Sequence, residues 1–392
     1  MSTRSAIRGA LCVAIFLALQ VGTAQGQTAH VSGKTLIIAE QDGKPDSVYI
    51  TDMPPRLPLH ALASGHYALD RFGHCFSSDG RFVALWSFDE DDSATLNVFS
   101  TDPSSATPPL KFTKDADFYA SYQWHPFLPK LLFVRHHAQA AAELTSLDCT
   151  DGTEEVLCRG KLLEEPSADK PWPRQLSPME ACWTPDGTGI VYVEFDSGKG
   201  PARIRSMRAT GDDPLYLSPT GQRSEYWPVV SPDGKAIAYT RGDGLWVMDL
   251  SGAHRRRIVA LSKPELAIGY PPIQDEEDSK YACEWTPDSR SIYIADHADC
   301  YSVVDKVDLR TGRLEPVGKD APASGAPWSW CPAYGFPPRT ASSGWHIGID
   351  QGNLWFVDET THTRQEVLKA ERGTTLRAVA WTPASGNRMA TP

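Results

Sequence analysis

The chain has 392 residues, of which 41% are hydrophobic and 22% are charged, and its formal net charge at pH 7 is −11. A chain of this length and composition can bury a large core, so an intrinsically disordered protein is excluded. The net negative charge, with no basic stretch longer than RRR at residues 255–257, also excludes nucleic acid and anionic membrane surfaces as partners.

Residues 1–26 have the three parts of a secretory signal peptide. Residues 1–8 are positively charged, residues 9–21 form an apolar run shorter than a membrane span, and residues 22–27 (GTAQGQ) offer small residues for cleavage. Cys12 lies inside the apolar run rather than near its end, so we expect no lipid anchor. We therefore expect an exported, soluble mature chain, periplasmic or secreted, without a transmembrane anchor.

Short strands separated by tight turns fill the rest of the chain, and residues 227–252 (WPVVSPDGKAIAYTRGDGLWVMDLSG) form the clearest unit. In SPDG the proline presets φ, the aspartate bonds the following backbone and the glycine accepts a left-handed conformation, so the chain reverses there. Alternation over residues 235–240, a second turn at 241–244 and an apolar run at 245–250 complete a pattern of three strands.

This pattern recurs about every fifty residues. In chain order the other copies are CFSSDGRFVALWS (75–87), YQWHPFLPKLLFVR (122–135), CWTPDGTGIVYVEFD (182–196), EWTPDSRSIYIAD (284–296) and WSWCPAYGFPPRTASSGWHIGID (328–350). A repeat of this length made of short strands predicts propeller blades. Trp183, Trp227 and Trp285 lie at or beside the turn motifs, so we expect them to pack between blades.

The two ends of the chain complement each other. Residues 34–62 hold the second, third and fourth strands of a unit, whereas residues 377–386 (RAVAWTPASG) hold a first strand and its turn. A ring that borrows this last strand for its N-terminal blade leaves no open sheet edge. We therefore expect an all-β fold, a seven-bladed β-propeller of four-stranded blades over residues 34–386, with a tail at 387–392. Six or eight blades are the alternatives.

The motifs WTPDG and SPDG before an apolar strand, followed by a strand that ends in Asp-x-x-Gly, resemble the WD40-like repeats of the TolB propeller family. The resemblance covers residues 34–386 and implies a propeller fold. TolB also carries an α/β domain ahead of its propeller, but here the signal passes into a strand within a few residues, so we expect the propeller alone.

Residues just before each repeat motif are expected to line one mouth of the central channel, because the innermost strand of each blade begins there. Aromatic rings among charged groups suit a peptide or a sugar, with ordinary polar loop residues as the alternative interpretation. The candidate ligand-binding residues are Asp70, Arg71, His74, Tyr122, Glu180, Arg223, Glu225, Tyr226, Asp278, Trp328 and Arg377. We expect alanine at both Arg223 and Glu225 to spare stability and weaken ligand capture.

Metal ligands and cysteine pairs give weaker signals. FDEDDS (88–93) and QDEEDS (274–279) lack the pattern of an EF-hand calcium loop, so solvated turns are preferred and we expect no cofactor, with a divalent cation as the alternative. Cys149 and Cys158 flank TDGTEEVL, where an Asp-Gly turn would pair Cys149 with Glu154. That register leaves Cys158 beyond bridging distance, and a disulfide would need a wider loop.

The chain contains no Gly-x-Ser-x-Gly, His-Glu-x-x-His or Cys-x-x-Cys motif, so we do not expect an enzyme. The sequence predicts a monomeric binding or scaffold module for an envelope or secreted protein, a peptide or an oligosaccharide. The repeats are also similar to those of oligogalacturonate lyases, which implies an alternative, a metal-dependent lyase or hydrolase of acidic oligosaccharides. His297, His346 and His362 are scattered and form no metal-ligand motif.

Overall fold

The computed structural model contains strands and turns, and none of the residues it describes is helical. Accordingly, no helix in the described part is long and apolar enough to cross a membrane. The structure describes residues 33–41, 47–52, 59–65, 67–68, 75–88, 94–105, 108–113, 122–137, 140–160, 179–195, 201–219, 224–241, 244–260, 281–286, 288–296, 303–318, 345–350, 353–358, 363–369 and 374–383.

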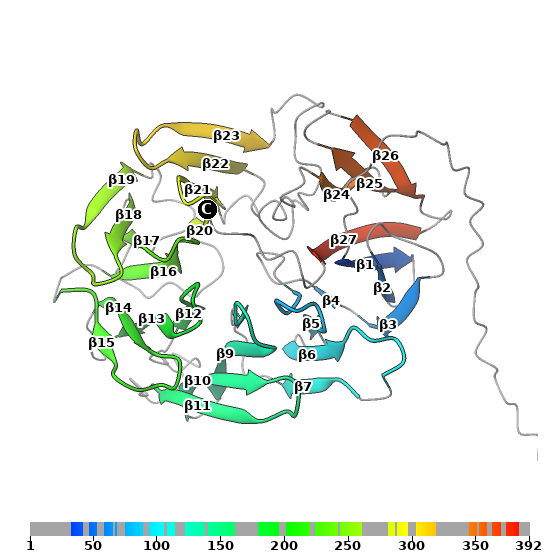
Figure 1. Cartoon of the computed structure of the whole chain (residues 1–392), viewed down its shortest axis with the longest axis horizontal. Helices are drawn as coiled ribbons and strands as arrows, with labels where there is room; N and C mark the ends of the chain where they lie inside the picture. The colour runs from blue at the N-terminus through cyan, green and yellow to red at the C-terminus, as the bar shows by residue number, and fades with distance from the viewer. Residues whose placement is uncertain are drawn as a thin grey trace, which may run out of the picture.

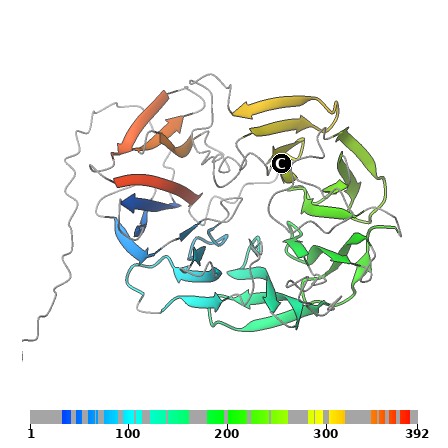
Figure 2. The ribbon, with the colours of Figure 1, turned by 180° about the vertical axis from the view of Figure 1, so that it is seen from behind.

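The strands form antiparallel sheets around a common centre (Figure 1), and the view from behind shows the same ring (Figure 2). This confirms the all-β, propeller-like architecture. We number the described sheets as blades 1 to 7, in chain order, each with its strands.

Blade 1 consists of β27 (Thr374–Pro383), β1 (Gly33–Gln41), β2 (Ser47–Asp52) and β3 (His60–Ser64). Blade 2 consists of β4 (Tyr67–Ala68), β5 (Phe82–Phe88), β6 (Ala94–Ser100) and β7 (Leu110–Thr113). Blade 3 consists of β8 (Tyr122–Trp124), β9 (Lys130–His137), β10 (Ala140–Asp148) and β11 (Glu154–Arg159). Blade 4 consists of β12 (Met179–Trp183), β13 (Gly189–Phe195), β14 (Ala202–Arg208) and β15 (Leu215–Tyr216). Blade 5 consists of β16 (Glu225–Val230), β17 (Ala236–Arg241), β18 (Gly244–Asp249) and β19 (Arg256–Ala260). Blade 6 consists of β20 (Tyr281–Trp285), β21 (Ser291–Asp296), β22 (Val303–Asp308) and β23 (Leu314–Gly318). Blade 7 consists of β24 (Trp345–Asp350), β25 (Asn353–Asp358) and β26 (Thr363–Leu368).

The first and last described strands are neighbours in blade 1. β27 pairs antiparallel with β1 from Gly33 opposite Pro383 to Gln41 opposite Thr374, with a bulge at Ile38 and Ala39. β27 includes residues 377–383, part of the segment in which the sequence predicts a first strand. Two segments from opposite ends of the chain therefore share one sheet.

The turn between the first two strands of a blade is fixed by its Ser or Thr and its Asp. In blade 4 the Thr184 hydroxyl donates to Asp186 Oδ1 (2.5 Å) and accepts from the Gly189 amide (2.9 Å), while the Thr188 amide donates to Asp186 Oδ1 (3.1 Å). The hydrogen bond from Thr184 lowers the pKa of Asp186. The same Ser/Thr-to-Asp bond recurs in other blades at 2.6–2.7 Å. The motif thus builds a rigid reversal.

The glycine that follows the third strand sets the spacing between blades. Gly211 has φ = 86°, and a Cβ there would lie 2.8 Å from the Leu157 carbonyl oxygen in the outer strand of blade 3. Gly312 has φ = 69°, and a Cβ there would likewise lie 2.8 Å from the Ile258 carbonyl oxygen in the outer strand of blade 5. Only glycine suits both the conformation and the close approach.

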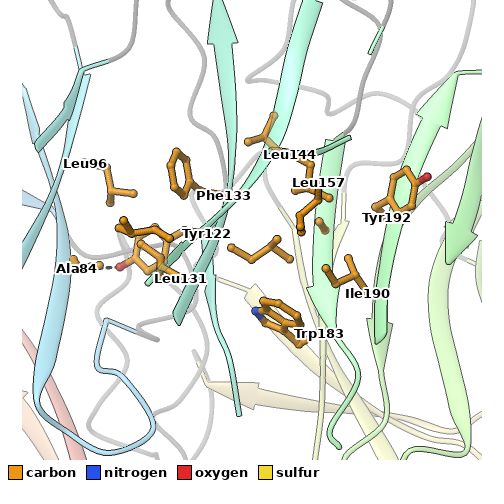
Figure 3. Packing of buried hydrophobic residues seen from close by; sticks show 14 of the residues in the cluster. Ala84, Leu96, Tyr122, Leu131, Phe133, Leu144, Leu157, Trp183, Ile190 and Tyr192 are labelled. Atoms are coloured by element: carbon orange, nitrogen blue, oxygen red, sulfur yellow. Dashed lines mark hydrogen bonds between the residues drawn. The ribbon is translucent and has the colours of Figure 1, made fainter. Parts of the chain in front are cut away.

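The hydrophobic core lies between neighbouring blades. Figure 3 shows one such cluster, in which Leu96 of blade 2, Leu131 of blade 3 and Ile190 of blade 4 contribute to a continuous core. Trp183 belongs to this cluster, Trp227 packs against the core between blades 4 and 5, and the Trp285 indole nitrogen donates across blades to the Val229 carbonyl (2.9 Å). The expected packing of these tryptophans between blades is confirmed.

The Cys149–Cys158 disulfide is absent, and the predicted register was wrong. Leu147, not Cys149, lies opposite Glu154, and Cys158 lies opposite Leu144. Cys149 is part of the turn, where its amide donates to the Pro129 carbonyl (2.9 Å). Both thiols are free, and burial raises the pKa of each to about 12.

Candidate functional site

The candidate mouth lies where the inner strands of the blades begin. Strands β12, β16 and β20 form the inner edges of their sheets (Figure 1). These blades share one strand order and antiparallel pairing, so their inner strands run in the same direction and start at the same end of the ring. Glu180 is the second residue of β12, and Glu225 is the first of β16.

The structure places only part of the predicted set. Tyr122, Glu225 and Tyr226 are described with their side chains, whereas Glu180 and Arg377 are placed by their strands, β12 and β27, alone. The remaining predicted residues lie outside the described ranges: Asp70, Arg71, His74, Arg223, Asp278 and Trp328. The acidic run 274–279 and residues 89–93 of the other acidic run also lie outside them.

Tyr122 was predicted to line the mouth, but its side chain is buried. It is 1% exposed, and its hydroxyl donates to the Ala84 carbonyl of blade 2 (2.7 Å) (Figure 3). The ring packs beside Trp86 in the core between blades 2 and 3. In this structure Tyr122 therefore holds two blades together and presents no ring to the channel.

Glu225 was also predicted to line the mouth, but its side chain is buried. Its side chain is 4% exposed. The Arg255 guanidinium donates two hydrogen bonds to the carboxylate, from Nη1 to Oε1 (2.6 Å) and from Nη2 to Oε2 (3.2 Å). The Ser218 hydroxyl of blade 4 also donates to Oε2. Burial alone would lower the pKa of Arg255, but the bond to Glu225 and its charge raise it. The group thus links blades 4 and 5.

Tyr226 is likewise buried, at 7% exposed. It belongs to the core cluster that joins Cys182 and Val191 of blade 4 to Tyr239 of blade 5. Its ring, predicted to stack on a ligand, is enclosed by protein in this structure. The start of β16 therefore contributes charge to the mouth end of the blade rather than an open aromatic face.

Arg241 and Trp246 were missed by the sequence analysis. Arg241, assigned to a turn, is the last residue of β17 and pairs with Glu225 across the strands. Its Nη1 lies 3.9 Å from Glu225 Oε1, and its guanidinium lies 5.2 Å from the centre of the Trp246 ring. The signal that could have found Arg241 is the SPDG hairpin, which places the start of one strand opposite the end of the next.

A bulge interrupts β16 beside this cluster. The register with β17 shifts between Tyr226 and Val229, and Trp227 has φ = 54°, a rare conformation for a residue that precedes proline. The Cys182 thiol of blade 4 donates to the Pro228 carbonyl (3.3 Å). Such a conformation costs about 1–3 kcal/mol and persists only when surrounding contacts enforce it.

Among the described residues, no group of three or more His, Cys, Asp or Glu side chains is arranged to hold a metal ion. The geometry at the described end of blade 5 consists of one buried carboxylate, two guanidinium groups and aromatic rings. Such an arrangement suits recognition of a charged ligand.

Two sequence matches bear on the repeats. Residues 214–299 match the family model described as the dipeptidyl peptidase IV (DPP IV) N-terminal region. The chain is also 31% identical over 86 residues to the Tol-Pal system protein TolB of Anaeromyxobacter dehalogenans (strain 2CP-C), a match that spans 21% of this chain and 19% of that protein. The resemblance of the repeats to TolB-like β-propellers is thus confirmed.

The similar solved structures share low sequence identity with this chain. TolB from Acinetobacter baumannii has 12% identity and a TM-score of 0.40, with 90% of this chain and 67% of that chain covered. An oligogalacturonate lyase in complex with manganese has 12% identity and a TM-score of 0.47, covering 88% and 89%. A putative 6-phosphogluconolactonase from Bacteroides uniformis ATCC 8492 has 16% identity and a TM-score of 0.48, covering 90% and 100%.

Proposed function

We propose that this chain is an exported β-propeller that acts as a binding or scaffold module and takes its ligand at the mouth where the inner strands begin. The observation that carries the proposal is the charged end of blade 5, where the half-buried Arg241 lies beside Glu225 at the start of β16. Glu180 belongs to another inner strand, so its placement supports the same mouth. The ligand is an envelope or secreted protein, a peptide or an oligosaccharide.

We infer further that the ring is closed as seven four-stranded blades. Six of the described sheets have four strands, the sheet of β24, β25 and β26 has three within the described residues, and β27 pairs with β1; these observations support the count and the closure. Pairing of the chain ends within one sheet protects edges that would otherwise be open. We expect such a ring to act as a monomer without a cofactor.

Export to the periplasm or beyond is part of the same proposal. Residues 1–26 carry the pattern of a signal peptide, and the chain resembles a protein of the Tol-Pal system. An affinity for an envelope protein is therefore the first binding activity to test.

The test is affinity capture from an envelope extract with the exported chain as bait. Arg241→Met serves as the mouth variant, and Arg290→Met serves as the control because Arg290 is exposed on a turn of blade 6 at the other end of the ring. Enrichment of one protein by the wild type and the control, but not by the mouth variant, is expected. Equal enrichment by all three would overturn the proposed mouth, and the absence of any enriched protein would overturn protein binding.

A metal-dependent lyase activity is the competing outcome. It would appear as cleavage of an acidic oligosaccharide that requires an added divalent cation. Cleavage by the wild-type chain at a rate well above the metal-free background would overturn the binding-module proposal. Its absence, together with specific capture, is the expected result.

A further inference from the structure

We infer that the mouth end of the junction between blades 4 and 5 holds a carboxylate-binding subsite built on the Arg241 guanidinium, with Trp246 as its supporting platform. The inference deepens the proposed function and rests on it, because it names the ligand chemistry for the same mouth. It rests on three observations: the charge of the cluster, the unused hydrogen-bond donors around it, and the fixed position of Arg241.

The cluster carries an excess positive charge. Arg255 already neutralises the charge of Glu225 through a bidentate pair of hydrogen bonds of 2.6 and 3.2 Å. Arg241 is then a second guanidinium beside a carboxylate that is already paired, and its 3.9 Å separation from Oε1 is longer than a hydrogen bond. Among the described residues of this cluster, two cations and one anion leave one positive charge at the end of β17.

The same place has donors without acceptors. Within the described residues, no group accepts a hydrogen bond from the Arg241 guanidinium, which remains 27% exposed. The Trp246 indole nitrogen and the Tyr239 hydroxyl are both buried, and neither has a hydrogen-bond partner in that part of the chain. Of these donors the Arg241 guanidinium is the accessible one, so a ligand that brings acceptor oxygens to it supplies the hydrogen bonds that it lacks.

The position of Arg241 is fixed before any ligand arrives. Tyr239 and Arg241 are two residues apart on β17 and point to the same face, and Trp246 lies directly opposite Tyr239 on β18. The guanidinium therefore rests against an aromatic ring of its own blade, at 5.2 Å from the ring centre. A stacked guanidinium loses less freedom on binding and keeps its edge available for an anion.

A carboxylate is the anion that fits best. The planar guanidinium presents parallel N–H groups that match two carboxylate oxygens, and Glu225 with Arg255 displays this geometry within the same cluster. The carboxylate could belong to an acidic peptide or to a uronic acid. Acidic peptides and uronic acids both carry the carboxylate, so the experiment compares a peptide ligand with a sugar ligand.

The experiment titrates the full exported chain with an oligoglutamate peptide and with a uronic acid oligosaccharide, following tryptophan fluorescence and calorimetric heat. Oligoglutamine and the neutral hexose oligosaccharide are the matched uncharged ligands. We expect the wild type and Arg290→Met to bind one acidic ligand equally and its uncharged counterpart not at all. Arg241→Met should weaken that binding at least about tenfold, and Arg241→Lys, which keeps the charge but loses the fork, should lie between them.

The outcomes also separate this inference from the proposed function. Equal affinity of Arg241→Met and wild type for the acidic ligand, or no binding of either acidic ligand to wild type, would overturn the subsite. Specific capture of an envelope protein would still stand in that case, because it does not depend on a carboxylate. If Arg241→Met fails to fold, Arg241→Lys decides the question, since wild-type affinity in that variant would contradict recognition by the guanidinium fork.

Discussion

The Nε2 atom of His125 lies 3.2 Å from the carbonyl oxygen of Gly187, which joins the first turn of blade 3 to the first turn of blade 4. The Nδ1 atom accepts from the amides of Phe127 and Leu128, each at 3.1 Å, so Nε2 carries the proton and donates it. The ring also packs edge-on against Trp183, with centroids 4.8 Å apart. One histidine thus replaces the hydroxyl and carboxylate that fix the turn in other blades.

Gly187 and Gly234 form a matched pair that tests this contact. They occupy the same turn position in blades 4 and 5 with φ of 70° and 68°, but a Cβ on Gly187 would lie 2.5 Å from His125 Cε1, whereas nothing lies within 4 Å at Gly234. Alanine at 234 should cost roughly 1 kcal/mol for the backbone alone. Alanine at 187 should cost clearly more in urea unfolding, about 1–3 kcal/mol beyond that.

A second variant identifies the source of that difference. Combining Gly187→Ala with His125→Ala removes the ring that the new methyl group meets, so part of the extra cost should disappear relative to the sum of the single changes. Strict additivity of the two substitutions would contradict a clash with His125.

His125 also predicts a dependence of stability on pH. Burial lowers the pKa of His125, only partly opposed by its bond to Gly187, so the folded state favours the neutral ring. Between this lowered pKa and the ordinary value of about 6.5, the unfolded chain binds more protons, and the free energy of unfolding therefore falls as pH drops below about 6.5. Urea unfolding at a series of pH values should show a shallower loss in His125→Asn than in wild type.

Much of the fold could be predicted from local pattern, because each turn motif carries its own hydrogen bonds. The Ser231 hydroxyl donates to Asp233 Oδ1 within one reversal (2.7 Å), and the strands on either side follow from alternation. The Asp233 amide adds a bond to the Ser289 hydroxyl of blade 6 (3.1 Å), which local pattern does not reveal. The register predicted for Cys149 and Cys158 was wrong because the turn after β10 is wider than a two-residue Asp-Gly turn. It begins at Asp148, whose carbonyl accepts from the Gly152 amide. The residue types in this segment do not reveal at which residue the turn begins.

The site was harder to predict because its contacts are distant in sequence. Glu225 begins an inner strand, which local pattern reveals, but its burial depends on Ser218 of the preceding blade and on Arg255 beyond the third strand of its own blade. Arg241 looked like a turn residue because RGDG reads as a loop. Its role emerges only once β17 is paired with both β16 and β18.

Removing the Glu225 carboxylate should destabilise the ring, contrary to the expectation from sequence. Glu225→Ala leaves the half-buried Arg255 without its anion and should cost about 3–5 kcal/mol in urea unfolding. Glu154→Ala is the control because it breaks the more exposed Arg135–Glu154 pair (2.5 Å), and it should cost about 0–1 kcal/mol. Adding Arg255→Met to Glu225→Ala should restore part of the loss. Equal stabilities of Glu225→Ala and the control would show that the buried pair contributes nothing special.

Two tryptophans at the same position of their blades differ in one hydrogen bond, which gives the last prediction. The Trp285 indole nitrogen donates to the Val229 carbonyl (2.9 Å), whereas the buried indole nitrogen of Trp183 has no hydrogen-bond partner among the described residues. Trp285→Phe removes the hydrogen bond between blades 5 and 6, although Val229 keeps its place opposite Ala238 in the β16–β17 ladder, while Trp183→Phe removes a donor that has no such bond to lose. Both lose similar apolar area, so Trp285→Phe should be the more destabilising by about 1 kcal/mol. Paired urea unfolding measures the difference, and a larger cost at Trp183 would mean that packing against His125, not the indole hydrogen bond, decides the strength of these blade contacts.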